Sequence, residues 1–300
     1  MMNILISVNK TFLNQAETML HSLRRNNRED MTVFLLNHSL SSAETKKFQK
    51  YLNERLKMNL VILDVSSTVL DQLPKKEERF SAEVFYRVLA QFVLPETVDR
   101  ILWLDADIIL MKNISDFYYQ DFEGNVIAAC PDAEFDGKEI ARIKGKIGLS
   151  REHIYFNSGV LLLNIEALRK KTNLEKIAQT AQSLSEYYVY PDQDLLNYLY
   201  SGQIKYCDQK KYNCLVKNAG ELTKAQMKDI VILHYAGEYK PWTLYHIHQL
   251  STFAIPYWKE VALQGKWISV LTMMVFYLLW MIYYKAGICY IVRKGISKGK

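Results

Sequence analysis

The chain has 300 residues, 49% of them hydrophobic, and a net charge of +6, which is an ordinary globular composition for one large domain or two modest ones. Residues 266–300 hold six of the 38 basic residues and none of the 32 acidic ones, so the rest of the chain is electrically balanced. A nucleic-acid-binding protein normally carries a basic stripe on its folded body, so we expect no nucleic-acid partner.

The first half of the chain alternates strand-like and helix-like stretches. Short apolar runs predict buried strands over 3–8, 32–36 and 59–65, and the first run is too short for the core of a signal peptide. Helical spacing predicts helices over 12–25 and 42–56, and a third from Ser81 as N-cap to a break at Pro95. This alternation predicts a parallel, doubly wound sheet with helices on both faces, whose ligands bind beyond the carboxyl ends of the strands.

The next predicted strand, 100–104, runs directly into the pattern Asp-Ala-Asp. In extended backbone, residues two apart point to the same side, so Asp105 and Asp107 can aim both carboxylates at one point beyond the sheet. Two anions held close together suit Mn²⁺ or Mg²⁺, and the metal would in turn bind phosphate. Alternatively, the pair only forms a turn. The chain has no Gly-rich phosphate-binding motif, so a nucleotide would have to be held through the metal.

Further along, residues 133–150 predict a loop or short helix whose lysines either meet an anionic glycolipid or face solvent. The four cysteines are scattered without a C-x-x-C pair, which favours reduced thiols in a cytoplasmic protein.

An uncharged run over 267–284 is about as long as a membrane crossing, which needs ~20 apolar residues. A single crossing from the cytoplasm would place the terminal basic residues outside, against the positive-inside tendency. We therefore expect residues 266–300 to lie in the inner face of the cell membrane, although a helix buried in the main domain is the alternative. The predicted division is a catalytic domain over 1–255 and a membrane-associating tail over 256–300.

Five stretches, in this order, resemble glycosyltransferase family 8, most nearly its lipopolysaccharide galactosyltransferases and glucosyltransferases, with glycogenin more distant. They are ISVNKTF (6–12), LWLDADIIL (102–110), FNSGVLLLNIEAL (156–168), YPDQDLLN (190–197) and LHYAGEYKPW (233–242). The resemblance implies a GT-A fold, which is a Rossmann-like doubly wound mixed sheet flanked by helices. It also implies a UDP-galactose or UDP-glucose donor, Mn²⁺ with Mg²⁺ as the second choice, and a glycan or lipid-linked acceptor.

The same resemblance implies roles for single residues. Asp105, Asp107 and His234 match the metal ligands, although a histidine after an apolar run is otherwise a core residue. Gly237 and Lys240 match the contacts to the donor's diphosphate; a solvated surface lysine is the alternative.

Other matched residues belong to the sugar and nucleotide pockets. Asp192 would hydrogen-bond sugar hydroxyls and Gln193 would lie beside the anomeric carbon, while the acidic residues also suit a helix N-terminus. Arg87 matches a donor-contacting arginine, or is an exposed helix residue. The remaining residues expected at the donor are Val8, Asn9, Ala106, Asn157 and Ser158. Asn9 stands where the lipopolysaccharide enzymes have an aspartate that reads the nucleobase.

Relatives in the family transfer the sugar with retention of configuration. Because the amide of Gln193 is a poor nucleophile, we favour attack by the acceptor on the face that the diphosphate leaves. Two alternatives are a metal-dependent nucleotidyltransferase and a non-catalytic, membrane-bound sugar-nucleotide binder. The nucleotidyltransferase gives no reason for the D-Q-D and H-Y-x-G-x-x-K-P-W stretches, and the complete ligand set argues against the binder.

Overall fold

The computed structural model describes residues 1–37, 39–64, 82–133, 137–238, 240–243 and 253–297. They form two compact units, Met1–His234 and Tyr235–Lys300. The predicted functional division at 255/256 stays a prediction.

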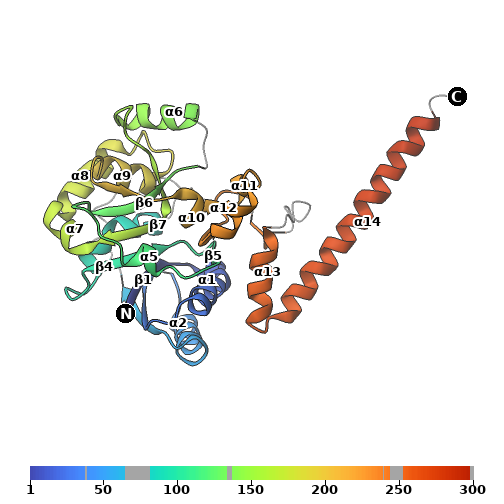
Figure 1. Cartoon of the computed structure of the whole chain (residues 1–300), viewed down its shortest axis with the longest axis horizontal. Helices are drawn as coiled ribbons and strands as arrows, with labels where there is room; N and C mark the ends of the chain where they lie inside the picture. The colour runs from blue at the N-terminus through green and yellow to red at the C-terminus, as the bar shows by residue number, and fades with distance from the viewer. Residues whose placement is uncertain (38, 65–81, 134–136, 239, 244–252, 298–300) are drawn as a thin grey trace. The chain divides into compact units, whose positions relative to one another are not determined.

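The first unit is built on a seven-stranded mixed sheet (Figure 1). Its order is β3 (Asn59–Asp64), β2 (Met31–Asn37), β1 (Met2–Ser7), β4 (Arg100–Leu104), β7 (Phe156–Asn164), β6 (Ile127–Pro131) and β8 (Ile204–Tyr206). All neighbouring pairs are parallel except those of β7, which runs antiparallel to β4 and β6. The expectation of a wholly parallel sheet is therefore wrong, and the mixed sheet implied by the resemblance is confirmed. A buried strand carries the same apolar run in either direction, so β7's sequence does not reveal its orientation.

A small second sheet lies beside the carboxyl end of β4. It consists of β5 (Ile108–Leu110), β10 (Ile232–His234) and β9 (Cys214–Leu215), with β10 in the middle. In this sheet His234 pairs with Ile108, the residue after Asp107. The histidine is thereby brought near the two aspartates, from which it is far away in sequence.

Helices cover both faces of the large sheet, as the alternation predicted. Alternate residues of β4 belong to different cores: Ile101 and Trp103 pack with one face, Leu102 and Leu104 with the other. Figure 1 shows α1 and α2 on one side of the sheet and α7, α8 and α9 on the other. The elements are η1 (Lys10–Phe12), α1 (Leu13–Asn26), α2 (Ser42–Tyr51), η2 (Leu52–Leu56), η3 (Ala82–Leu89), α4 (Ala90–Val93), α5 (Ser115–Tyr118), α6 (Gly137–Ile147), α7 (Ile165–Lys171), α8 (Leu174–Leu184), α9 (Pro191–Leu199), α10 (Gln209–Tyr212), α11 (Val216–Ala219) and α12 (Lys224–Asp229).

The helical segments predicted over 12–25 and 42–56 are confirmed within a residue or two, as α1 and as α2 continued by the π-helical turn η2. The third predicted helix is present over 82–93 but begins as the 3₁₀ helix η3; its expected cap, Ser81, lies outside the described residues. Behind it, the guanidinium of Arg169 donates hydrogen bonds to five carbonyls of the segment 91–98. These carbonyls belong to Gln91, Leu94, Pro95, Glu96 and Val98.

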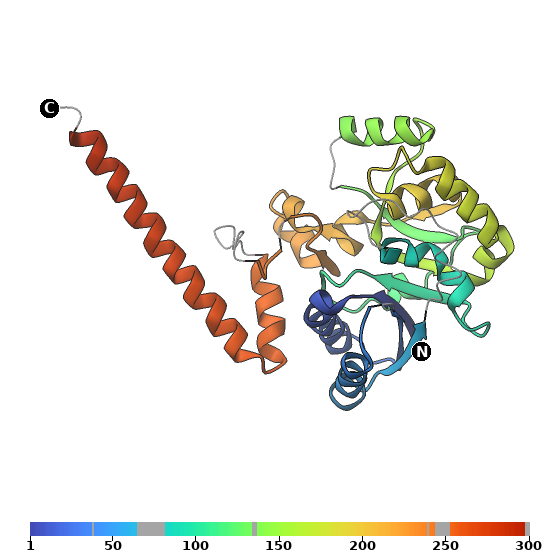
Figure 2. The same ribbon diagram turned by 180° about the vertical axis from the view of Figure 1, so that it is seen from behind.

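The second unit contains α13 (Ala254–Leu263) and α14 (Trp267–Ser297), and Figure 2 shows α14 as one uninterrupted helix. Edge-to-face and tilted ring contacts join Tyr235, Trp242 and Tyr257 in this unit. Among the residues that the structure describes, no helix has the length and apolar character of a membrane span.

Candidate active site

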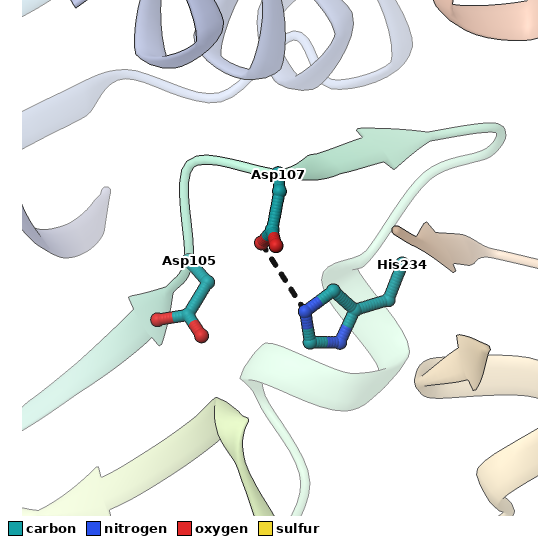
Figure 3. Close-up of side chains that lie close together, drawn as sticks. All are labelled: Asp105, Asp107 and His234. Carbon is teal, nitrogen blue, oxygen red and sulfur yellow. Dashed lines mark ion pairs between the residues drawn. The ribbon is translucent and has the colours of Figure 1, made fainter. Parts of the chain in front are cut away.

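Asp105, Asp107 and His234 converge at the carboxyl end of β4 (Figure 3). One ligand atom from each lies within 4.8 Å of the others, and His234 Nε2 is 3.2 Å from Asp107 Oδ1. The expected reason for this convergence is only partly right. The strand ends at Leu104, and Ala106 and Asp107 form a turn, so the turn into β5 aims the second carboxylate rather than the pleat of a strand.

This donor set fits a divalent cation. Two carboxylate oxygens and an imidazole nitrogen suit Mn²⁺, which accepts mixed oxygen and nitrogen ligands. The space around the three groups also depends on a glycine. A Cβ added to Gly159 would come within 2.4 Å of His234 Cε1 and 2.9 Å of Asp105 Oδ2. Only glycine at this position leaves the histidine and the carboxylate where they are.

Arg87, from η3, lies between the candidate metal ligand Asp105 and Asp192 of the D-Q-D stretch. Its guanidinium is 3.1 Å from Asp105 Oδ1 and 3.0 Å from Asp192 Oδ2, and it also donates to the carbonyl and hydroxyl of Ser158. Burial penalises its charge, but the carboxylates of Asp105 and Asp192 outweigh this and raise the pKa of Arg87. The alternative of an exposed helix residue is wrong, because the side chain is only 14% exposed.

Gln193, in the first turn of α9, is held by two hydrogen bonds within the protein. Its Oε1 accepts the backbone N–H of Ser158 at 2.9 Å, and its Nε2 donates to Asp132 Oδ2 at 3.0 Å. The hydroxyl of Ser158 donates to Asp192 at 3.0 Å. Asp192, Gln193, Asn157 and Ser158 are all buried here. The helix N-terminus interpretation is confirmed, because Asp192 and Gln193 lie in the first turn of α9, whereas their contact with a sugar stays a prediction.

These contacts form one continuous series of polar residues that begins at Asp105 and ends at His234, on either side of the candidate metal site; we call it the polar ring. Asn157 donates to Asp132 and accepts from Asn213, and Asn213 in turn contacts His234 Nδ1 at 2.7 Å. The ring comprises Asp105, Arg87, Asp192, Ser158, Gln193, Asp132, Asn157, Asn213 and His234.

The third residue of D-Q-D has a structural task. Asp194 Oδ2 accepts the backbone N–H groups of Val189 and Tyr190, and its Oδ1 accepts the hydroxyl of Tyr155. It is fully buried, and this burial raises the pKa of its carboxyl despite the three hydrogen bonds that lower it. Asp194 thus fixes the entry into α9 rather than facing a sugar.

The remaining predicted donor residues lie in two places. Val8 is buried just beyond β1, and Asn9 caps η1 by accepting from the N–H groups of Thr11 and Phe12. Gly237 and Lys240 belong to the second unit, where Gly237 has a φ of 73° and the Lys240 ammonium donates to the carbonyl of Tyr235. Their contacts to a nucleotide stay a prediction.

Two members of the polar ring were missed from the sequence. Asp132 follows β6 as Asp105 follows β4, so the rule that sites lie beyond carboxyl ends of strands could have found it. Asn213, in the stretch Lys-Tyr-Asn-Cys-Leu, carries no comparable signal.

Comparison with known proteins decides the class of this site. Residues 3–245 match the profile of glycosyl transferase family 8. The chain belongs to that family. This confirms the resemblance inferred from the five stretches and makes the protein a hexosyltransferase, so the nucleotidyltransferase and the non-catalytic binder are ruled out as classes.

Two curated family members show the degree of relatedness. A lipopolysaccharide 1,2-glucosyltransferase of Escherichia coli K12 is 26% identical, over 89% of this chain and 79% of its own length. A lipopolysaccharide 1,3-galactosyltransferase of Salmonella typhimurium is 25% identical, over 84% and 76%. Among solved structures, the galactosyltransferase LgtC with donor and acceptor sugar analogues superposes with a TM-score of 0.72 at 21% identity, covering 88% of this chain and 96% of that one. The family 8 chain therefore has the GT-A fold.

Proposed function

We propose that the protein is a metal-dependent, retaining family 8 enzyme that moves galactose or glucose from a UDP-sugar to a glycan or glycolipid of the bacterial cell surface. The observation that supports this most directly is the convergence of Asp105, Asp107 and His234 at the carboxyl end of β4, where Arg87 pairs with both Asp105 and Asp192. The relatives named for lipopolysaccharide glucosyl and galactosyl transfer support the choice of sugar and acceptor class.

In this proposal Asp105, Asp107 and His234 hold a Mn²⁺ or Mg²⁺ ion. The ion would supply Lewis acidity to the departing diphosphate. Gly237 and Lys240 bind the diphosphate, Val8, Asn9 and Ala106 bind the nucleoside, and a lysine ammonium suits the negative charge that builds up as the sugar leaves.

Arg87 and the first turn of α9 position the sugar. Arg87 locks the carboxylate of Asp192, which leaves that group rigidly placed to accept hydrogen bonds from sugar hydroxyls. Asn157 and Ser158, whose side chains are held by hydrogen bonds within the polar ring, complete the sugar site in this proposal.

The environment of Gln193 supports front-face attack. Its amide oxygen already accepts the Ser158 N–H, and its amide nitrogen is tied to Asp132, so the side chain has little freedom to approach a carbon and bond to it. An amide oxygen is also a weak nucleophile. Gln193 therefore orients the anomeric carbon, and a diphosphate oxygen takes the proton of the acceptor hydroxyl.

The test uses purified protein, UDP-galactose or UDP-glucose, and Mn²⁺, with release of UDP as the readout. Asp105→Ala, Asp107→Ala and His234→Ala should each lower turnover by at least about 100-fold while the protein stays folded. Asp229→Ala is the matched control, because that carboxylate is 74% exposed and its ion pair is with Lys112, which is itself 48% exposed. Wild-type turnover by either Asp105→Ala or Asp107→Ala would refute the metal assignment, and no turnover of any UDP-hexose by the wild type would refute the donor.

We further propose that the tail holds the enzyme on the inner membrane face, beside a lipid-linked acceptor. Of the α14 side chains that the structure describes, large apolar ones are exposed along the helix: Trp267, Ile268, Leu271, Met274, Val275, Phe276, Leu278, Leu279 and Ile282. A helix apolar on most of its surface needs an apolar surrounding. Basic residues at 293, 294, 298 and 300 would meet anionic head groups.

Deleting residues 266–300 tests the membrane proposal separately. The shortened enzyme should still hydrolyse its UDP-sugar but should neither sediment with anionic vesicles nor glycosylate membrane-bound acceptors efficiently. Full-length protein that stays out of the vesicle pellet would contradict the proposal.

A further inference from the structure

The second nitrogen of the His234 ring is held by a buried asparagine. Asn213 immediately precedes β9, the strand that pairs with β10, and its Oδ1 lies 2.7 Å from His234 Nδ1. Asn213 is 1% exposed and His234 is 2% exposed. The hydrogen bond between them is therefore shielded from exchange with water.

A backbone N–H determines which atom of Asn213 faces the histidine. The N–H of Gly159 donates to Asn157 Oδ1 at 3.0 Å, and a backbone N–H can only donate, so this atom of Asn157 must be its oxygen. The Asn213 atom that lies 2.9 Å from the same oxygen must then be the amide nitrogen. Its oxygen is left facing His234 Nδ1, so that ring nitrogen must carry the hydrogen.

We propose that Asn157 and Asn213 are positioning residues that fix His234 as its Nδ1–H tautomer. Nε2 then presents a lone pair to the space shared with Asp105 and Asp107. The inference rests on the proposed function, in which that lone pair binds the cation.

In the other tautomer, His234 would bond to Asp107 and no longer be available to a cation. With hydrogen on Nε2, the ring would donate to Asp107 Oδ1, 3.2 Å away, and both groups would be satisfied without a cation. The hydrogen bond between Asn157 and Asn213 excludes this tautomer. The Asn213 amide would have to turn over to donate to Nδ1, and its oxygen would then face Asn157 Oδ1, two acceptors 2.9 Å apart. The asparagines thus keep the ligand set open toward a positive ion.

The tautomer can be observed without any metal or substrate. Protein labelled with ¹⁵N in its histidines is examined by long-range proton–nitrogen NMR at alkaline pH, where an imidazole is neutral, and His234→Gln assigns the signals. Wild-type His234 should show hydrogen on Nδ1 and an unprotonated Nε2. Hydrogen on Nε2 in the wild type would overturn the proposal.

Substitutions at Asn213 add a second measurement, the affinity for Mn²⁺ alone by calorimetry. Asn213→Ala should redistribute the hydrogen between the ring nitrogens and weaken Mn²⁺ binding by about 10–100-fold, as loss of a partner behind a ligating histidine does. Asn213→Asp keeps an oxygen toward Nδ1 and should therefore keep the hydrogen on that nitrogen, although its second oxygen, facing Asn157 Oδ1, should lower the melting temperature. Asn125→Ala is the control, because Asn125 bonds to the carbonyls of Phe122 and Glu123 at the opposite end of β6 from Asp132.

The outcomes separate this inference from the proposed function. Unchanged Mn²⁺ affinity in Asn213→Ala, beside weakened affinity in His234→Gln, would overturn the inference and leave the metal site standing. An Asn213→Asp spectrum like that of Asn213→Ala would do the same. A wild type that binds no Mn²⁺ but shows Nδ1–H would refute the metal proposal alone.

Discussion

Replacing Gly159 by alanine should disable the candidate metal site through a single methyl group. The added Cβ would lie 2.4 Å from His234 Cε1, 2.9 Å from Asp105 Oδ2 and 3.1 Å from Asn157 Oδ1. Carbon atoms pack at about 3.5–4.0 Å, so the histidine ring has to retreat by roughly 1 Å or more. The backbone of Gly159 does not have a positive φ, so the effect comes from contact and not from backbone strain.

The size of the effect follows from where the ring can go. His234 is almost fully buried between β5 and β9, and overpacking a site of this kind costs about 1–3 kcal/mol. For a domain of this size that corresponds to a Tm lowered by roughly 2–12 °C. A displacement of about 1 Å at a catalytic group can lower turnover about 100-fold, and we expect at least that loss together with weaker Mn²⁺ binding.

The assay combines three measurements on Gly159→Ala: thermal melting, Mn²⁺ titration and release of UDP from the donor sugar. Gly220→Ala is the matched control, because a Cβ there meets no atom within 4 Å and its φ of −65° suits alanine. The control should match the wild type in all three. Wild-type Mn²⁺ affinity and turnover in Gly159→Ala would refute the conclusion that a Cβ at this position displaces His234.

Three further outcomes follow from the contacts described. Gln193→Ala should keep measurable UDP release, reduced about 10–1,000-fold, whereas a sugar trapped covalently on wild-type Gln193 would contradict its positioning role. Asp194 has a raised pKa in the folded protein, so its contribution to stability falls as the pH rises from its unfolded pKa of about 3.9 to the folded value. Asp194→Asn should remove that decline, because the amide can donate to the hydroxyl oxygen of Tyr155 and does not ionise. Unfolding in denaturant at several pH values would show the difference. Arg169→Ala should destabilise the protein by about 3 kcal/mol in denaturant unfolding, yet leave donor turnover at 25 °C near normal, because its five carbonyl partners lie away from the polar ring.

The parts of the fold that could be predicted are those with a local pattern. The strands near residues 3, 32, 59 and 100 and the helices between them follow from apolar periodicity, which reports the burial of each element directly. The direction of β7 could not be predicted, because orientation depends on how the chain returns to the sheet and not on the strand's own residues. The same holds for the pairing of β10 with β5, which brings His234 to Asp107.

The candidate site shows the same division between local and long-range information. Asp105 was found from the rule about strand ends, but the resemblance to family 8 was needed for His234 and Arg87, since nothing near either residue indicates its partner. Asn213 was missed for a physical reason. Its importance lies in which atom of a symmetric-looking amide faces the histidine, and that is fixed by the N–H of Gly159, 54 positions earlier in the sequence.

The charges of the polar ring explain why its two ends should act together. The ring contains the carboxyl groups of Asp105, Asp192 and Asp132, with Asp107 beside it, and the single guanidinium of Arg87. In the proposed reaction a UDP-sugar would bring further negative charge to this place, and a divalent cation would offset the repulsion. Arg87 bonds both to Asp105, a proposed cation ligand, and to Asp192, the proposed sugar contact, so a cation that draws Asp105 toward itself would also act on Asp192. Under the proposed function, the cation that balances the charge of the diphosphate would therefore also influence how Asp192 is held for the hexose.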